Sequence, residues 1–188
     1  MKELSGYLTG KFLMASPQMA DPRFEHALIY ICGHDENGAM GIVVNKPMPN
    51  LTFKTLLEQL HLASVSSPIN LPIFLGGPVE PTRGFVLHSD DYTHPATMTF
   101  GKHISLTSTL DILEAIANGR GPKNCLLALG YAGWSSGKLE QELHDNGWLQ
   151  FEGEEDLLFE VPVQQKWTEA MKRLGLEIAT LSTQMGHS

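Results

Sequence analysis

Cysteine is scarce in this sequence, and long hydrophobic runs are missing. The only two cysteines, Cys32 and Cys125, lie far apart in apolar runs and lack CxxC spacing. This pattern favours two buried small hydrophobic residues over a disulfide or metal site, with a redox-active thiol as the alternative. No apolar run approaches the ~20 residues that cross a bilayer. Lys11 and polar residues interrupt the N-terminal segment, so we predict no signal peptide and a cytoplasmic location.

Positive charge is also in deficit. The chain has 13 Lys and Arg against 21 Asp and Glu, which gives a net charge of -8 at pH 7. The basic residues are scattered and form no stripe, which argues against direct DNA or RNA binding, because phosphate contacts dominate such affinity. Residues 138–160 carry most of the acidic excess. They predict a solvated acidic face, with a basic partner as the alternative.

What the sequence does contain is enough apolar material for one globular domain. Hydrophobic residues make up 42% of the 188 residues, and the mean hydropathy is -0.10, so we expect a single domain over 1–188. Asn37-Gly38 between two apolar runs predicts a hairpin. Alternating or buried apolar runs predict strands at 7–15, 26–32, 42–45, 73–77, 83–89, 97–107, 125–130 and 148–151.

Four helices are expected among these strands. Thr52 should cap the first, and Ser108 with Asp111 resembles a capping box for the second. The helical patterns span 52–60, 108–118, 137–146 and 164–174. Because strands come first, as hairpins, and helices are inserted later, the chain reads as α+β, with a curved mixed sheet and a few covering helices.

The segment GWSSG, residues 133–137, fits the G-x-S-x-G elbow of serine hydrolases. A hydrolase of that type also needs a histidine base oriented by an acid, and both should follow the serine. His144 falls within the next predicted helix and His187 is the penultimate residue. We therefore interpret the segment as a tight turn in which Ser135 or Ser136 caps the following helix. A serine-dependent hydrolase using Ser135 is the alternative.

Two other runs have candidate chemistry. FLGGPVEP, residues 74–81, places two glycines after a predicted strand, but Pro78 and Pro81 remove donors that a phosphate cradle needs. A turn at which two strands approach closely is the favoured interpretation. HSDDYTH, residues 88–94, has imidazoles and carboxylates without zinc-site spacing. We predict no catalytic residue, no metal and no cofactor.

Three blocks in order carry a family resemblance: FLMASPQMADPRFEHALIYICGHDENGAMGIVVNKP, FLGGPVEPTRGFVLHS and LGYAGWSSGKLEQEL, followed by Trp148. Together they resemble the AlgH/YqgE family of small, largely uncharacterised bacterial proteins, from about Gly6 to Trp167. The resemblance implies one α+β domain whose mixed, mostly antiparallel, branched sheet curls into a partial barrel. One branch of the family is named as a candidate transcriptional regulator of exopolysaccharide production, and no enzymatic reaction comes with the resemblance. The family often has Gly, Ala or Pro where this chain has Ser135 and Ser136.

The glycine-rich turns predict a surface groove that combines polar and aromatic groups, which suits a small ligand or a peptide. Its predicted residues are Asn45, Gly76, Gly77, His88, Tyr131 and Trp134. The expected function is a non-enzymatic, cytoplasmic binding or regulatory module whose partner is a small ligand or a protein. The serine hydrolase is the second hypothesis and a nucleic-acid binder the third.

Overall fold

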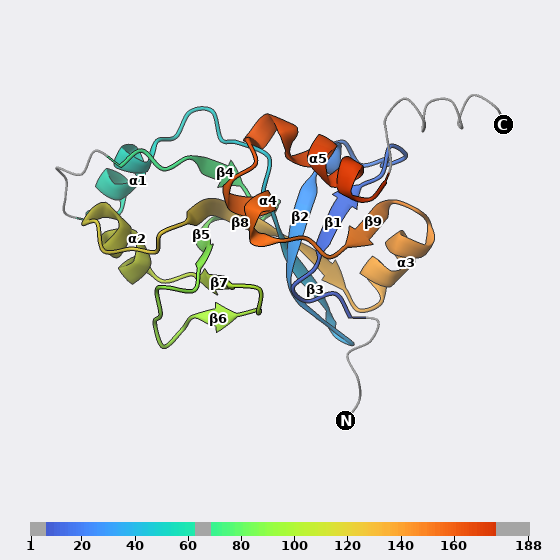
Figure 1. The fold of residues 1–188 in the computed structure, drawn as a ribbon, viewed down its shortest axis with the longest axis horizontal. Helices are drawn as coiled ribbons and strands as arrows, with labels where there is room; N and C mark the ends of the chain where they lie inside the picture. The colour runs from blue at the N-terminus through green and yellow to red at the C-terminus, as the bar shows by residue number, and fades with distance from the viewer. Residues whose placement is uncertain (1–6, 63–68, 176–188) are drawn as a thin grey trace.

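A single sheet organises the chain in the computed structural model, which describes residues 7–62 and 69–175 (Figure 1). Its strands lie in the order β6-β7-β5-β8-β3-β2-β1-β9, and β4 branches from β8. The strands are β1 (Phe12–Ala15), β2 (Leu28–Asp35), β3 (Gly38–Val43), β4 (Ile73–Leu75), β5 (Val79–Ser89), β6 (Met98–Thr99), β7 (Ile104–Thr107), β8 (Cys125–Ser135) and β9 (Trp148–Phe151).

Strand β8 holds the two halves of the sheet together. Its first half pairs with β5 on one side and with β4 on the other, whereas its second half pairs with β3. Between the halves, Gly130 has a φ of 80°, which a glycine adopts without steric cost. Every pairing except β4 with β8 is antiparallel. The predicted α+β class and the curled, branched, mostly antiparallel sheet are confirmed.

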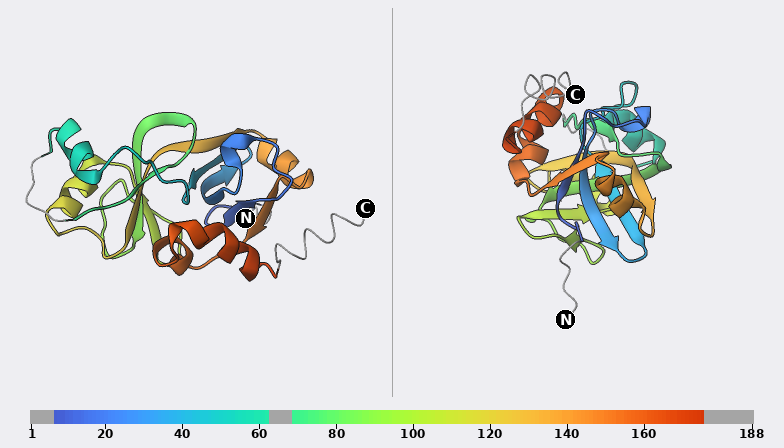
Figure 2. Two further views of the ribbon diagram at one scale, coloured as in Figure 1. Left: turned by 90° about the horizontal axis from the view of Figure 1, so that it is seen from above. Right: turned by 90° about the vertical axis from the view of Figure 1, so that its right-hand side faces the viewer.

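Helices cover this sheet from both ends and along one side (Figure 2). They are α1 (Phe53–Gln59), α2 (Leu110–Ala117), α3 (Lys138–His144), α4 (Glu155–Phe159) and α5 (Lys166–Arg173), with 3-10 turns η1 (Pro22–Phe24) and η2 (Val163–Gln165). The first helix is capped as predicted, because the Thr52 hydroxyl accepts the Thr55 amide at 3.1 Å. None of the helices in the described ranges is long and apolar enough to cross a membrane.

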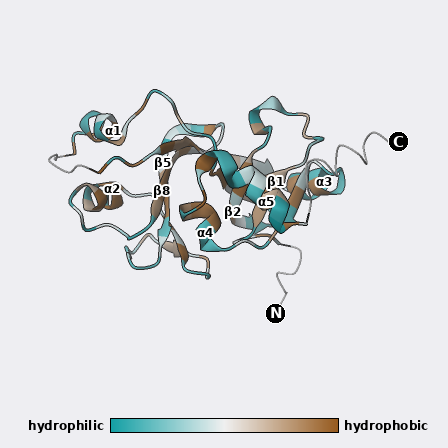
Figure 3. Cartoon of the chain, turned by 45° about the horizontal axis from the view of Figure 1, so that its top comes forward, coloured by the Kyte–Doolittle hydropathy of each residue, from teal (hydrophilic) through white to brown (hydrophobic). Residues whose placement is uncertain are grey.

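Alternation along the strands builds two cores on opposite faces of the sheet. Phe12 and Met14 join the core that α4 and α5 cover, while Leu13 and Ala15 face the interior of the half-barrel, which α3 closes. A third core lies beneath α1 and α2. The central strands are coloured as apolar in Figure 3, whereas polar residues lie along the helices.

Two local predictions were wrong, and one helix was missed. Ser108 and Asp111 form no capping box: Thr109 is the N-cap of α2 without a side-chain bond, and Asp111 instead contacts the His94 imidazole at 2.9 Å. The helix predicted at 164–174 is present as α5, with η2 as its first turn, whereas α4 was not predicted. The first strand begins only at Phe12, because the backbone turns at Gly10 with a φ of 84°.

Candidate binding site

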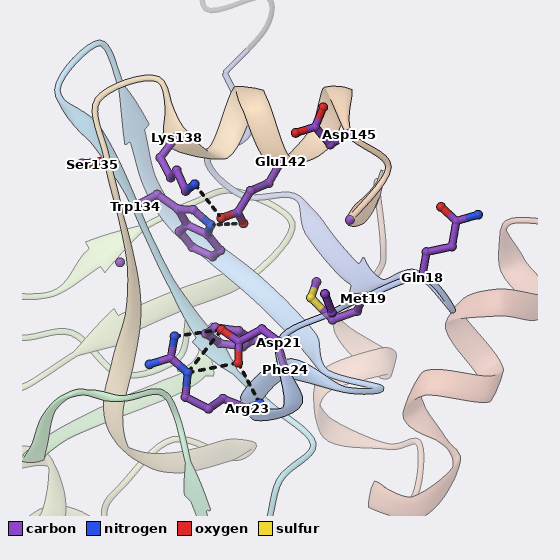
Figure 4. Close-up of a pocket in the computed structure, with 13 residues that line it drawn as sticks. Gln18, Met19, Asp21, Arg23, Phe24, Trp134, Ser135, Lys138, Glu142 and Asp145 are labelled. Carbon is purple, nitrogen blue, oxygen red and sulfur yellow. Dashed lines mark hydrogen bonds and ion pairs between the residues drawn. The ribbon is translucent and has the colours of Figure 1, made fainter.

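A cleft of about 510 Å³ opens between segment 18–24, the end of β8 and helix α3 (Figure 4). The chain segments that form it are distant in sequence and meet because the half-barrel brings β8 and β9 towards each other, with α3 joining them. Its lining combines aromatic, acidic and basic groups: Gln18, Met19, Ala20, Asp21, Arg23, Phe24, Gly133, Trp134, Ser135, Lys138, Glu142, Asp145 and Gly147.

One wall is held by the Glu142 carboxylate on α3. Its Oε1 accepts the indole N–H of Trp134 at 3.0 Å and that of Trp148 at 2.9 Å. The two rings meet edge to face, with centroids 6.0 Å apart. Lys138, one helical turn earlier, places its Nζ 3.9 Å from Oε2 (Figure 4). A hydrogen bond to a carboxylate is stronger than one between neutral groups, so the bond to Glu142 fixes the Trp134 ring in the wall of the cleft.

The opposite lip is preformed by η1. Asp21 caps this turn: its Oδ1 accepts the Arg23 amide at 2.9 Å, and its Oδ2 accepts the guanidinium at 2.8 Å. The hydrogen bond from Arg23 lowers the pKa of the Asp21 carboxyl. Phe24 then packs its edge on the Trp148 ring, with centroids 5.6 Å apart. Both lips of the cleft therefore contact the same buried indole.

The serine hydroxyls at the turn do not cap α3, which corrects the sequence interpretation. Gly137 is the N-cap, with a φ of 75° and no side-chain bond. The Ser136 hydroxyl donates instead to the carbonyl of Glu36 at 2.6 Å, which ties the turn to the β2–β3 hairpin. Ser135 lines the cleft. Within residues 7–62 and 69–175, neither hydroxyl is hydrogen-bonded to an imidazole, and His187 lies outside the described residues.

A histidine–carboxylate pair lies close to this turn in the fold, where the β2–β3 hairpin meets the end of β8. The buried His34 ring on β2 accepts the Leu8 amide at Nδ1, at 3.0 Å, and its Nε2 lies 3.1 Å from Glu140 Oε2 on α3. Because Nδ1 is an acceptor, the ring proton is on Nε2 and is donated to Glu140. Both ring nitrogens are thus engaged, and the pair links the N-terminal segment to α3.

The structure brings two of the predicted groove residues together. Tyr131 and Trp134 both line a shallow hollow of about 540 Å³ over the β2–β3 hairpin, and Trp134 also lines the cleft. Gly76 and Gly77 allow close backbone contact: a Cβ added at Gly77 would overlap the Tyr131 carbonyl. These two glycines therefore hold β8 against the end of β4.

Asn45 and His88 are engaged elsewhere. Asn45 Oδ1 accepts the Leu28 amide at 2.9 Å and its Nδ2 donates to the His26 carbonyl at 2.8 Å, so this side chain joins two loops. His88 is fully buried in β5, where Nδ1 donates to the Ser89 carbonyl at 2.7 Å and Nε2 accepts the Thr107 hydroxyl at 2.8 Å. Burial lowers the pKa of His88.

The acidic run at 88–94 divides into separate pairs. Asp91 accepts from the Ser89 hydroxyl at 2.6 Å and from the Lys123 amide at 2.9 Å, while Asp90 contacts His103 at 2.9 Å. Across the described ranges, no three His, Cys, Asp or Glu side chains gather as metal ligands.

Both cysteines are free thiols. Cys32 is buried and Cys125 is partly buried, as two small hydrophobic residues would be. Burial raises the pKa of both thiols, that of Cys125 to about 11. Neither thiol is therefore ionised to a useful extent near neutral pH.

Several cleft residues were not predicted from the sequence, namely Asp21, Arg23, Lys138 and Glu142. In the sequence, Glu142 is recognisable only as one of the charged residues of its predicted helix. The spacing of residues does not show that Trp134 and Trp148, on two different strands, hydrogen-bond to it. The proline-flanked segment that contains Asp21 and Arg23 lies between the predicted strands 7–15 and 26–32. Its Asp-Pro-Arg order is the one available signal, since an Asx cap followed by proline favours a helical turn.

Comparison with known proteins gives consistent matches. Residues 12–179 match the sequence profile of a family described as AlgH-like. A UPF0301 protein of Bradyrhizobium diazoefficiens is 46% identical over 98% of this chain and 90% of its own length. A UPF0301 protein of Thioalkalivibrio sulfidiphilus is 46% identical over 98% of each chain.

Two solved structures share the fold. The solution structure of the AlgH protein from Pseudomonas aeruginosa is 39% identical, with a TM-score of 0.79 over 97% of this chain and 96% of that one. The crystal structure of protein DIP2367 from Corynebacterium diphtheriae is 18% identical, with a TM-score of 0.69 over 88% and 86% of the two chains. At that identity, the second match concerns the fold alone.

Proposed function

We propose that this chain, which belongs to the AlgH-like family, is a non-enzymatic binding or regulatory module of the bacterial cytoplasm. The cleft between segment 18–24 and α3 is its ligand site. The observation that carries this proposal is the double hydrogen bond from Trp134 and Trp148 to Glu142, which holds an aromatic wall in place before any ligand arrives.

The size and lining of the cleft fit this role. Its volume of about 510 Å³ lies in the usual range for ligand sites, which are roughly 300–1,000 Å³. Trp134, Phe24 and Met19 supply apolar contact, and charged groups lie at both lips. A wall and lip that are already ordered reduce the entropy lost on binding. The expected ligand is a small molecule or peptide segment with an apolar group flanked by polar ones.

The charge distribution supports action through a protein or small ligand rather than through direct contact with DNA. The chain carries a net charge of -8, and three of the five charged residues that line the cleft are acids. A regulatory role would then depend on what the cleft binds.

The test is fragment and peptide binding to the isotope-labelled full chain, followed by amide chemical shifts. Ligands should shift the amides of segment 18–24, of 133–135 and of α3. Ala20 is exposed and lines the cleft, so Ala20→Trp should fill the space and weaken binding at least tenfold. Ala96→Trp, at an exposed site that does not line the cleft, is the matched control and should bind as wild type does. Ligands that leave these amides unchanged, or that bind Ala20→Trp equally well, would show that the cleft is not the site.

One observation keeps the serine hydrolase as a second candidate: Ser135 lines the cleft. A fluorophosphonate probe discriminates the two functions. We expect no stoichiometric labelling of the native chain, since the neighbouring His34 has both nitrogens engaged. Rapid labelling that disappears in Ser135→Ala would replace the binding function with hydrolysis.

A further inference from the structure

We propose that the occupant of the cleft is an extended peptide segment, which adds as a strand to the free edge of β8 at residues 132–135. This inference rests on the proposed function and specifies its ligand. It follows from the hydrogen-bonding pattern of β8, from the position of the cleft along that strand and from the charges of the lining.

The second half of β8 has a partner on one side only. In the sheet, β5 and β3 lie on opposite sides of β8. Strand β3 pairs with Ala132 to Ser135, but the last residue of β8 that pairs with β5 is Tyr131, opposite Val79. In the part of the chain that the structure describes, no other backbone group hydrogen-bonds to residues 132–135. Alternate N–H and C=O groups on the β5 side of this segment are therefore available to another strand.

The cleft opens along this edge. Gly133, Trp134 and Ser135 all line it, although successive side chains of a strand point to opposite faces. Because Gly133 has no side chain, it borders the cleft with its backbone. No side chain shields the backbone there, and a Cβ placed at Gly133 would meet the Tyr131 ring at 3.5 Å, an ordinary van der Waals contact. Four residues of edge match a peptide strand of about 13 Å.

Strand addition explains how this lining can recognise a peptide. Backbone hydrogen bonds supply affinity that is independent of sequence, and pockets for alternate side chains supply specificity. The Trp134 wall and Phe24 offer apolar contact to a side chain that points into the cleft (Figure 4). In Figure 4, both rings lie on the same side of the β8 ribbon, towards segment 18–24.

The charges favour a peptide with a basic residue near one end. Arg23 is paired with Asp21 at 2.8 Å, and Lys138 lies beside Glu142. Asp145 is the remaining acid of the lining, with its side chain 65% exposed and the exposed His144 imidazole at 3.4 Å. A lysine or arginine of the peptide that reaches Asp145 would meet an accessible carboxylate at the rim.

The experiment uses three synthetic peptides and the labelled full chain. The parent peptide is acetyl-Lys-Val-Thr-Val-Thr-Val-Lys-amide, which is extended, apolar on one face and basic at both ends. Two analogues carry N-methyl groups on either the odd or the even residues, so each loses the donors along one edge only. Because a peptide in a sheet presents one edge to β8 and the other to solvent, one analogue should bind at least tenfold more weakly than the parent and the other should bind nearly as well.

The parent peptide should also shift the amides of 132–135 and slow the hydrogen exchange of those that face the β5 side. Asp145→Lys should weaken its binding at least threefold, while Glu114→Lys, an exposed acid on α2 that does not line the cleft, should leave it unchanged. Equal binding of both N-methyl analogues would overturn strand addition but leave the cleft as a ligand site. Strand addition would also be overturned if about 1 mM peptide left the amides of 132–135 unshifted while small fragments still bound the cleft. If neither peptides nor fragments bind there, the proposed function itself fails.

Discussion

Replacing the buried lysine of α5, as Lys166→Met, should change how the stability of this protein depends on pH. The Lys166 side chain is 2% exposed and its Nζ donates to the carbonyls of Val44 at 3.1 Å and Leu158 at 2.8 Å. The ammonium also lies 5.4 Å from the centroid of the Phe74 ring. No carboxylate is bonded to it among the described residues, and burial lowers the pKa of Lys166 from 10.5 to about 8.

The size and sign of the effect follow from proton linkage. The folded chain releases this proton near pH 8 and the unfolded chain near pH 10.5, so the unfolded state binds more protons between these values. Stability attributable to this group therefore rises with pH in that window. Below pH 8 the buried ammonium lowers the free energy of unfolding by its full amount, about 3 kcal/mol at 1.36 kcal/mol per pKa unit. Relative to pH 7, wild type should gain about 1 kcal/mol by pH 9 and about 2 kcal/mol by pH 9.5.

The assay is urea unfolding of wild type and Lys166→Met in parallel at pH 7, 8, 9 and 9.5, at constant ionic strength. Methionine is unbranched and similar in length, so it fills the site with little strain. Other groups titrate equally in both proteins, and the difference in unfolding free energy between them isolates Lys166. We expect this difference to move in favour of wild type as the pH rises above 8. A difference that stays constant from pH 7 to 9.5 would refute a buried ammonium with a lowered pKa.

Three further perturbations test the fold and the site. Gly77→Ala should destabilise the chain by at least about 3 kcal/mol in urea unfolding, because its Cβ would overlap backbone, whereas Gly33→Ala, with no atom within 4 Å, should cost about 1 kcal/mol or less. Glu142→Ala leaves two indole N–H groups without an acceptor and should cost about 2 kcal/mol, whereas Glu142→Gln, which keeps an oxygen, should cost less; equal losses would contradict the hydrogen-bonding role. With its pKa raised to about 11, Cys125 should react with a disulfide reagent at pH 7.5 roughly 100-fold more slowly in the native chain than in urea, as should the buried Cys32; rapid native labelling would restore the redox hypothesis.

Much of the fold was predictable because it depends on local pattern. Asn37-Gly38 between apolar runs predicted the β2–β3 hairpin, and Thr52 predicted the start of α1. Both signals operate over a few residues, where backbone sterics and one hydrogen bond decide the conformation. The cap of α3 was mispredicted because a hydroxyl can satisfy any nearby acceptor, and the hairpin brings the Glu36 carbonyl closer to Ser136 than sequence distance suggests.

The sequence by itself therefore determined the class of the fold, the family and most of its strands. It also named Tyr131 and Trp134 as residues of a predicted surface groove. Only the tertiary structure decided that Glu142 joins two indoles, that His34 is bonded to Glu140, and where along β8 the pairing with β5 stops. Those features depend on how the sheet curls and how far each strand extends before it leaves its neighbour. Such distances are set by packing over the whole half-barrel, and no periodicity or local spacing encodes them.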